Sequence, residues 1–146
     1  MIFDSKEVAV VKAFLDASMA PDPDRAAALM SPDVVITFTG KRVMPTVHGV
    51  TAFNASRYQW VKKQLGEFDW MEKSPGHVVV YCTGYLYGVW PDGREFAGNR
   101  YLDRYEVLDG SIIKMDVWND SKKKKFFITK VCSLTSYIDI IAYSLI

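Results

Sequence analysis

The chain has 146 residues and a net charge of +1, with 49% hydrophobic, 24% charged and 14% aromatic residues. This length favours one domain with a sizeable core, and the composition is typical of a soluble globular protein rather than a disordered one. Residues 1–120 carry 13 Lys and Arg against 16 Asp and Glu, so this part of the chain lacks the basic patch that nucleic-acid binding requires.

Targeting signals and cysteine content favour a cytoplasmic protein. The N-terminal segment has early acids and lacks the apolar region of a secretory signal, and no apolar stretch approaches the roughly 18 residues of a membrane span. The two cysteines, Cys82 and Cys132, have no metal-like spacing and are too few for a disulfide framework. We therefore expect buried thiols in a reducing compartment.

The first half of the chain predicts three helices and one strand. Apolar residues recur at helical spacing over residues 5–19, and the segment APDPDRAAALM predicts a turn and a short helix that stops before Ser31-Pro32. The β-branched segment DVVITFT predicts a strand, which the irregular segment GKRVMPTVHG follows. A third helix is predicted from Thr51 to Leu65.

The second half predicts strands separated by tight turns. The strand-like segments are EFDWMEKS, HVVVYCTGYLYGVW, REFAGNRYLDRYEV and SIIKMDVWN, and each turn between them contains glycine. Such a succession indicates an antiparallel meander. Helices followed by a curled antiparallel sheet make an α+β fold.

Three segments carry a resemblance to a known family: ALMSPDVVITF, the pair His48-Gly49, and RYLDRYEVLDGSIIKMDVWND. With them the chain resembles the SnoaL-like and ketosteroid-isomerase-like enzymes of the nuclear-transport-factor-2-like superfamily, and its last hairpin is most similar to the phenazine-biosynthesis A/B subgroup. The resemblance implies a cone-shaped, curved antiparallel or mixed sheet wrapped around N-terminal helices, with an apolar cavity. Residues 1–120 would form this cone domain, and residues 121–146 an atypical tail that is Lys-rich and then apolar.

Ketosteroid isomerases use a carboxylate base, together with a tyrosine and a protonated aspartic acid that hydrogen-bond the enolate oxygen. When the chain is laid beside that pattern, the tyrosine position falls on Phe14, the base position on Phe38 and the aspartic acid position on Asp103. Two of the three groups are absent. The resemblance therefore argues against steroid isomerase chemistry.

Asp103 is the candidate acid or base. Alternation along its strand places three further polar side chains on the same face, those of Asn99, Tyr101 and Tyr105. They could orient a substrate carbonyl or hydroxyl by hydrogen bonds. In the alternative interpretation Asp103 is a structural acid, hydrogen-bonded by the tyrosines or paired with an arginine such as Arg94 or Arg42. The residues leave both interpretations open.

A second set of residues is expected to bind the substrate. Aromatic side chains of the predicted elements can line a pocket for a flat apolar ligand. Alternation turns one face of the last strand toward the same pocket. The set comprises Phe14, Phe38, Phe53, Trp60, Trp70, Tyr85, Met115, Val117 and Asn119. Aromatic residues at such spacing also occur as plain core.

The remaining candidates are expected to be structural. Alternation sends Asp116 to the outer face of the last strand, His48 shapes the start of the third helix, and His77 is an exposed turn residue. Isolated histidines without clustered carboxylates predict no metal site. The sequence has no Gly-rich phosphate loop and no dinucleotide fingerprint, so we expect no cofactor.

These observations support two hypotheses. In the first, the protein is a cofactor-free acid–base enzyme of the isomerase, cyclase or dehydratase class that acts on a hydrophobic carbonyl-bearing or polyketide-like small molecule. In the second, it is a non-catalytic small-molecule-binding or dimerisation domain. Phe14 and Phe38 favour this second hypothesis, because they replace two catalytic groups. In both, we expect a homodimer formed through the outer sheet face, and neither nucleic acid nor a membrane as partner.

Overall fold

The structure, a computed structural model, describes residues 5–121, 125–128 and 140–143. The helices of the first range are α1 (Lys6–Met19), α2 (Pro23–Ala27) and α3 (Val47–Arg57). Its strands are β1 (Met30–Phe38), β2 (Arg42–Met44), β3 (Trp60–Ser74), β4 (His77–Val89), β5 (Glu95–Leu108) and β6 (Ser111–Asn119). The two short ranges are β7 (Lys125–Ile128) and β8 (Ile140–Tyr143), which pair antiparallel with each other. The rest of the predicted tail, including Cys132, lies outside the described residues.

Helix α1 begins as its sequence predicts. The Ser5 hydroxyl accepts a hydrogen bond from the backbone N–H of Val8 at 3.0 Å, which satisfies one of the unpaired donors in the first turn. The apolar stripe of the helix is fully or almost fully buried and comprises Val8, Val11, Phe14 and Leu15. This stripe joins the core cluster formed with the sheet.

The predicted end of the second helix is wrong. Helix α2 ends at Ala27, and β1 already begins at Met30, so that Ser31-Pro32 belongs to a strand. The pairing of β1 with β6 shifts register between Met30 and Val35. Proline is tolerated in a strand at such an irregularity, where its missing N–H costs no ladder hydrogen bond.

The third helix starts and ends earlier than the predicted Thr51–Leu65. The Thr46 hydroxyl caps its start by accepting a backbone N–H hydrogen bond at 3.0 Å. The helix ends at Arg57, after which the backbone becomes extended. Residues 60–74 form β3, which pairs with β4 along its length. Strand pairing therefore overrides the helical periodicity of this segment, because tertiary hydrogen bonds outweigh a weak local propensity.

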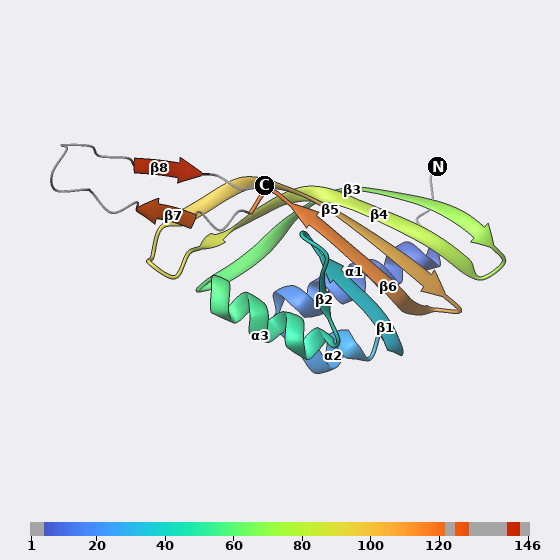
Figure 1. The fold of residues 1–146 in the computed structure, drawn as a ribbon. Helices are drawn as coiled ribbons and strands as arrows, with labels where there is room; N and C mark the ends of the chain where they lie inside the picture. Colours follow the sequence, from blue (N-terminus) through green and yellow to red (C-terminus); the bar gives the residue numbers. More distant parts are fainter. Residues whose placement is uncertain (1–4, 122–124, 129–139, 144–146) are drawn as a thin grey trace, which may run out of the picture.

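The six strands of the main sheet have the order β2-β1-β6-β5-β4-β3. Strands β3 to β6 form the predicted antiparallel meander, whereas β1 runs parallel to β6. All three helices lie on one side of the curved sheet (Figure 1). The structure thus confirms the predicted α+β fold, with a mixed sheet that is not closed.

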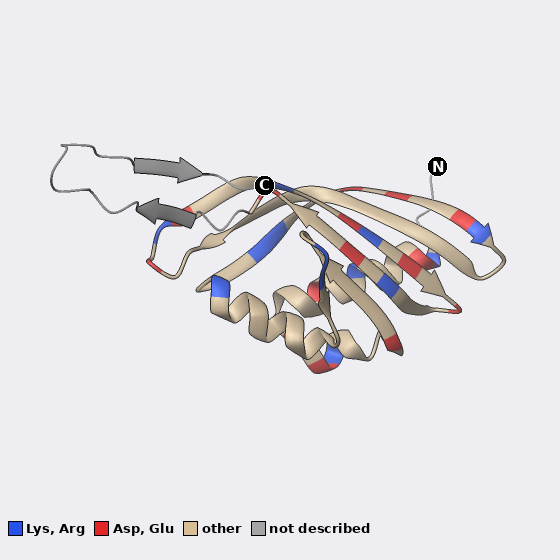
Figure 2. Cartoon of the chain, viewed as in Figure 1, with Lys and Arg blue, Asp and Glu red and all other residues tan. Residues whose placement is uncertain are grey.

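The outer face of the sheet carries charges of both signs. Figure 2 shows acidic and basic positions interspersed along β5 and β6. The register places Arg104 opposite Asp116, and the Asp116 carboxylate lies 3.8 Å from the Arg104 guanidinium and 3.7 Å from the Lys114 ammonium. Asp116 therefore lies on the outer face, as predicted.

Glu106 is the centre of an ion-pair cluster on this face. Its carboxylate lies 2.8 Å from Arg104, 2.9 Å from Nε2 of His77 and 3.1 Å from Lys73. The prediction of His77 as an exposed turn residue is wrong, because its side chain is only 21% exposed and contacts Glu106. The hydrogen bond from Arg104 is the main cause that lowers the pKa of Glu106 to about 2, against the opposing effect of burial.

The substitution Glu106→Gln should reduce the acid sensitivity of the fold. The unfolded chain protonates Glu106 near its ordinary pKa of 4.5, whereas the folded chain protonates it near 2. The stability that the carboxylate contributes is therefore complete above pH 4.5 and is lost as the pH falls toward 2. Urea unfolding at neutral pH and at about pH 3 measures the free energy of unfolding at each pH. Between these two values this free energy should fall by more in the wild type than in Glu106→Gln. The exposed control Glu95→Gln should behave as the wild type, and equal losses in all three proteins would contradict the assignment.

We propose that the outer face forms the interface of a homodimer. Leu102 and Trp118 lie opposite each other in the β5–β6 register and are 38% and 48% exposed. Exposed apolar groups among charged ones suit a self-complementary interface. Sedimentation at micromolar concentration should show a dimer that Trp118→Lys dissociates. The control Trp70→Lys, on a residue paired with inward-facing Val80, should leave it intact, and a monomeric wild type would refute the proposal.

Candidate functional site

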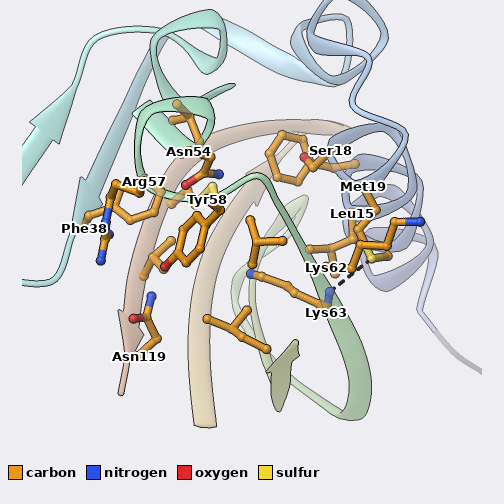
Figure 3. Close-up of a pocket in the computed structure, with 16 residues that line it drawn as sticks. Leu15, Ser18, Met19, Phe38, Asn54, Arg57, Tyr58, Lys62, Lys63 and Asn119 are labelled. Atoms are coloured by element: carbon orange, nitrogen blue, oxygen red, sulfur yellow. Dashed lines mark hydrogen bonds between the residues drawn. The ribbon is translucent and has the colours of Figure 1, made fainter. Parts of the chain in front are cut away.

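An apolar cavity lies between the helices and the inner face of the sheet (Figure 3). Its cavity volume is about 90 Å³, which is below the roughly 300–1,000 Å³ of typical small-molecule sites, and its mouth is open to solvent. Helices α1 and α3 and strands β1, β3, β4 and β6 contribute its walls. Its main apolar side chains are Phe14, Leu15, Phe38, Leu86, Met115 and Val117. The apolar lining therefore suits a hydrophobic group, and a larger ligand would extend through the mouth or require the walls to move.

Five of the nine residues predicted to bind substrate line this cavity: Phe14, Phe38, Met115, Val117 and Asn119. Phe53 packs behind one of them, with its ring centre 6.0 Å from that of Phe38. Three others are outside the lining, and their residues are 45%, 38% and 48% exposed: Trp60, Trp70 and Tyr85. Tyr85 is outside because alternation along β4 turns its neighbour Leu86 inward instead.

Lys63 is a lining residue that the sequence did not single out. It falls in the segment predicted as the end of the third helix, but in β3 it shares the inner face with Val61, and both line the cavity. Only 17% of its side chain is exposed. Strand-like alternation of residues 60–65 would have placed Lys63 on the same face as Val61, but the segment was interpreted as a helix.

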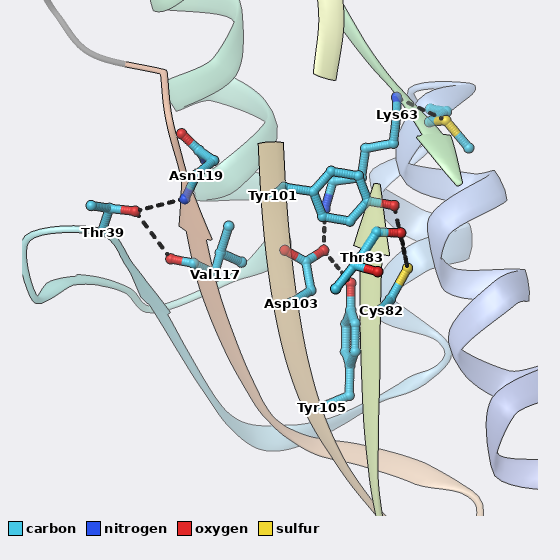
Figure 4. A network of polar contacts seen from close by, with 10 residues as sticks. Thr39, Lys63, Cys82, Thr83, Tyr101, Asp103, Tyr105, Val117 and Asn119 are labelled. Atoms are coloured by element: carbon cyan, nitrogen blue, oxygen red, sulfur yellow. Dashed lines mark hydrogen bonds and ion pairs between the residues drawn. The ribbon is translucent and has the colours of Figure 1, made fainter. Parts of the chain in front are cut away.

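The Lys63 ammonium forms an ion pair with the Asp103 carboxylate (Figure 4). Asp103 has no exposed surface, and its Oδ2 atom also accepts a hydrogen bond from the Tyr105 hydroxyl at 2.9 Å. Neither arginine considered as a partner pairs with it: Arg94 pairs with Asp92 at 2.7 Å, and Arg42 stacks on an aromatic ring. The partner of Asp103 is therefore a lysine that lies on another strand.

Tyr101 extends this network. Its hydroxyl lies 3.3 Å from Sγ of Cys82, and the Lys63 ammonium lies 4.3 Å from its ring centre, within reach of a cation–π contact. Burial raises the pKa of Tyr101, of Tyr105 and of the Cys82 thiol. All three groups therefore stay protonated at neutral pH, so they can donate hydrogen bonds but do not act as bases.

One atom of the network has no partner. Asp103 Oδ1 is buried and makes no hydrogen bond within the described part of the chain. In Figure 4 the Asp103 carboxylate lies between Lys63 and Val117, both of which line the cavity, whereas Asp103 does not. A carboxylate oxygen with free lone pairs can accept a proton or a hydrogen bond. Because this oxygen is buried, access to it requires a neighbouring side chain to move.

Asn99 and His48 lie apart from this network. The Asn99 amide donates to the Ser121 hydroxyl at 3.2 Å, and Nε2 of His48 lies 2.7 Å from Asp24 Oδ1, which links α3 to α2. Among the described residues no group of three or more His, Cys, Asp or Glu could hold a metal ion. No helix in the described ranges has the length and apolar character to cross a membrane.

Comparison with known proteins identifies the fold. No family model matches the sequence, and no curated protein matches it. A solved nuclear-transport-factor-2-like (NTF2-like) protein from Burkholderia thailandensis superposes with a TM-score of 0.65 and 16% identity, covering 81% of this chain and 92% of that one. The chain has the NTF2-like fold. This confirms the predicted SnoaL-like and NTF2-like resemblance at the level of the fold.

Two further solved neighbours have informative names. A provisionally named SnoaL-like polyketide cyclase from Jannaschia sp. has a TM-score of 0.61 and 19% identity over 82% of this chain and 92% of its own. TerC, co-crystallized with polyporic acid, has a TM-score of 0.60 and 16% identity over 77% of this chain and 90% of its own. At such identities the similarity establishes the fold alone.

The Lys63–Asp103 pair, which lies beside the cavity, should be energetically coupled. Asp103→Asn should lower the free energy of unfolding by roughly 3 kcal/mol, because it leaves a mostly buried ammonium without its counter-charge. Lys63→Met should also destabilise the protein, whereas the double variant should be at least about 1 kcal/mol more stable than the sum of the two effects. Urea unfolding measures all three.

The matched control is Lys62→Met, since Lys62 is the adjacent lysine and its ammonium lies 6.0 Å from the centre of the Trp60 ring. Its effect should add to that of Asp103→Asn. If the effects of Lys63→Met and Asp103→Asn on the free energy of unfolding were also strictly additive, the ion pair would contribute nothing to stability.

Proposed function

We propose that this protein is a cofactor-free acid–base enzyme of the isomerase, cyclase or dehydratase class. Its substrate is a hydrophobic carbonyl-bearing or polyketide-like small molecule. The observation that carries the proposal is the Lys63–Asp103 ion pair beside an apolar cavity, with one carboxylate oxygen unpartnered. A buried charged pair is costly to maintain, and such pairs in cavities are candidates for catalysis.

The chemistry needs two groups, and the pair supplies both. A substrate carbonyl draws the Lys63 ammonium away from Asp103 and accepts its hydrogen bond. The Asp103 carboxylate then takes a proton from the carbon next to the carbonyl. The electron pair of that C–H bond forms a C=C bond, and the π pair of the carbonyl moves to the oxygen to give an enolate. Lys63 stabilises the negative charge on this oxygen in a water-poor site. Tyr105 holds the carboxylate by its 2.9 Å hydrogen bond.

The fate of the enolate decides the reaction class. Return of the proton from Asp103 to another carbon gives an isomer, and attack of the enolate carbon on a second carbonyl of the same molecule closes a ring. A ring closure of this kind is consistent with the polyketide cyclase names of some solved neighbours. The apolar walls favour both outcomes, because they exclude the water that would otherwise protonate the enolate.

A second function has its own support. Asp103 has no exposed surface and does not line the cavity, and the positions of the ketosteroid isomerase tyrosine and base carry Phe14 and Phe38. These observations favour a cavity that holds a hydrophobic ligand without converting it. In that case the ion pair only joins β3 to β5.

Proton exchange distinguishes these two functions without knowledge of the natural substrate. The wild type should accelerate the exchange of the C–H protons next to the carbonyl of 2-tetralone in D2O, as followed by NMR. Asp103→Asn should lose most of this acceleration, by a factor of about 100 or more, since it removes the base. The outer-face control Lys114→Met should retain it. A wild type that binds 2-tetralone but does not accelerate exchange would support the binding function and overturn the enzyme proposal.

A further inference from the structure

We propose that the ligand of this cavity is an apolar carboxylic acid whose carboxylate binds Arg57. The inference names the substrate class and rests on the part of the proposed function that places a ligand in the cavity, but not on turnover. It begins with the charges of the lining, which includes three cations, Arg57, Lys62 and Lys63, and no Asp or Glu. An apolar cavity with basic groups alone in its lining selects anions over neutral molecules and cations.

Two of these three cations have other roles. The charge of Lys63 is compensated by the Asp103 carboxylate. Lys62 is an exposed residue whose ammonium lies 6.0 Å from the centre of the Trp60 ring, which is outside the lining. The Lys62 ammonium therefore lies near a ring outside the cavity lining, and Arg57 is the lining cation best placed to offer its charge to a ligand in the cavity.

The Arg57 guanidinium is held in place but not neutralised. It donates one hydrogen bond to the backbone carbonyl of Ser121 at 3.2 Å, and its carbon atom Cζ lies 5.1 Å and 5.3 Å from the ring centres of Phe53 and Tyr58. No carboxylate within the described ranges forms an ion pair with it. A guanidinium has five N–H donors and matches a carboxylate with two parallel hydrogen bonds. The described residues use only one of these donors, that to Ser121.

A second guanidinium lies close by. Cζ of Arg42 is 4.7 Å from the centre of the same Phe53 ring, so the two cations lie within about 10 Å of each other, near the screening length of physiological salt. Like charges at such a separation repel each other. A bound anion relieves this repulsion, which adds to the preference for an acidic ligand.

The two ends of the cavity differ in chemistry. Figure 3 shows Arg57, Phe38 and Asn119 at one end and Lys63 at the other, with Tyr58 between them. Asn119 Oδ1 accepts the Ser121 N–H at 3.0 Å, which leaves the amide NH2 group of Asn119 as a further donor at the Arg57 end. A ligand with its carboxylate at Arg57 therefore extends its apolar body toward Lys63, where the proposed chemistry takes place.

Calorimetric titration of the full chain with 2-naphthoic acid and 2-naphthamide tests the inference, because the two molecules match in shape and differ in charge. At neutral pH the acid should bind the wild type about tenfold more tightly than the amide. Arg57→Met should remove this preference while it leaves the amide affinity within about twofold, which also shows that the variant is folded. Arg57→Lys should retain part of the preference, and Arg94→Met, at an exposed arginine paired with Asp92, should retain all of it.

Each other outcome counts against a stated claim. Equal affinities of the wild type for the two molecules, or a preference that persists in Arg57→Met, would overturn the role of Arg57 and leave the proposed function standing. If neither molecule binds the wild type, the cavity is not a site for apolar ligands, and both the inference and the proposed function fail. Added salt should weaken the binding of the acid only, since screening acts on the charged ligand.

Discussion

The inner half of this structure is organised by one constraint, the need to compensate a carboxylate that has no contact with water. Taking Asp103 out of water costs several kcal/mol, and in the described chain its ionised partner is Lys63. The two residues lie on β5 and β3, so the pair crosses β4 and ties together three strands. The position of Lys63 at the cavity wall follows from this constraint.

The ion pair spans β4, where there is little room for a side chain, and a glycine occupies this position. A Cβ atom at Gly84 would lie 2.1 Å from the backbone oxygen of Gln64 and 2.9 Å from the Tyr101 ring. Real side chains do not tolerate such distances, so a larger residue would displace the Tyr101 ring, over which the Lys63 ammonium sits. Gly84 is thus explained by the close approach of strands and rings.

The two faces of the sheet carry independent charge systems because strand alternation separates them. Glu106 lies three residues after Asp103 on the same strand. It contacts several basic side chains and has partial access to water, and its pKa falls to about 2. Asp103 has one ionised partner and a bare second oxygen. The same side-chain chemistry therefore meets different surroundings on the two faces: several partners and partial access to water on the outer face, and one ionic partner beside a cavity on the inner face.

Local patterns were sufficient for the α+β fold, the antiparallel meander, the inward face of Asp103 and several of the lining residues, because turn signals and strict alternation act over a few residues. They failed at residues 60–65, where a helical period and a strand period both fit and only pairing with β4 decided between them. The sequence therefore determined that Asp103 would be buried among tyrosines. Only the tertiary structure decided that a lysine 40 positions away compensates the Asp103 carboxylate. It likewise decided that Arg57 lies at the other end of the cavity from Lys63. Both positions depend on which strands and helices meet in space.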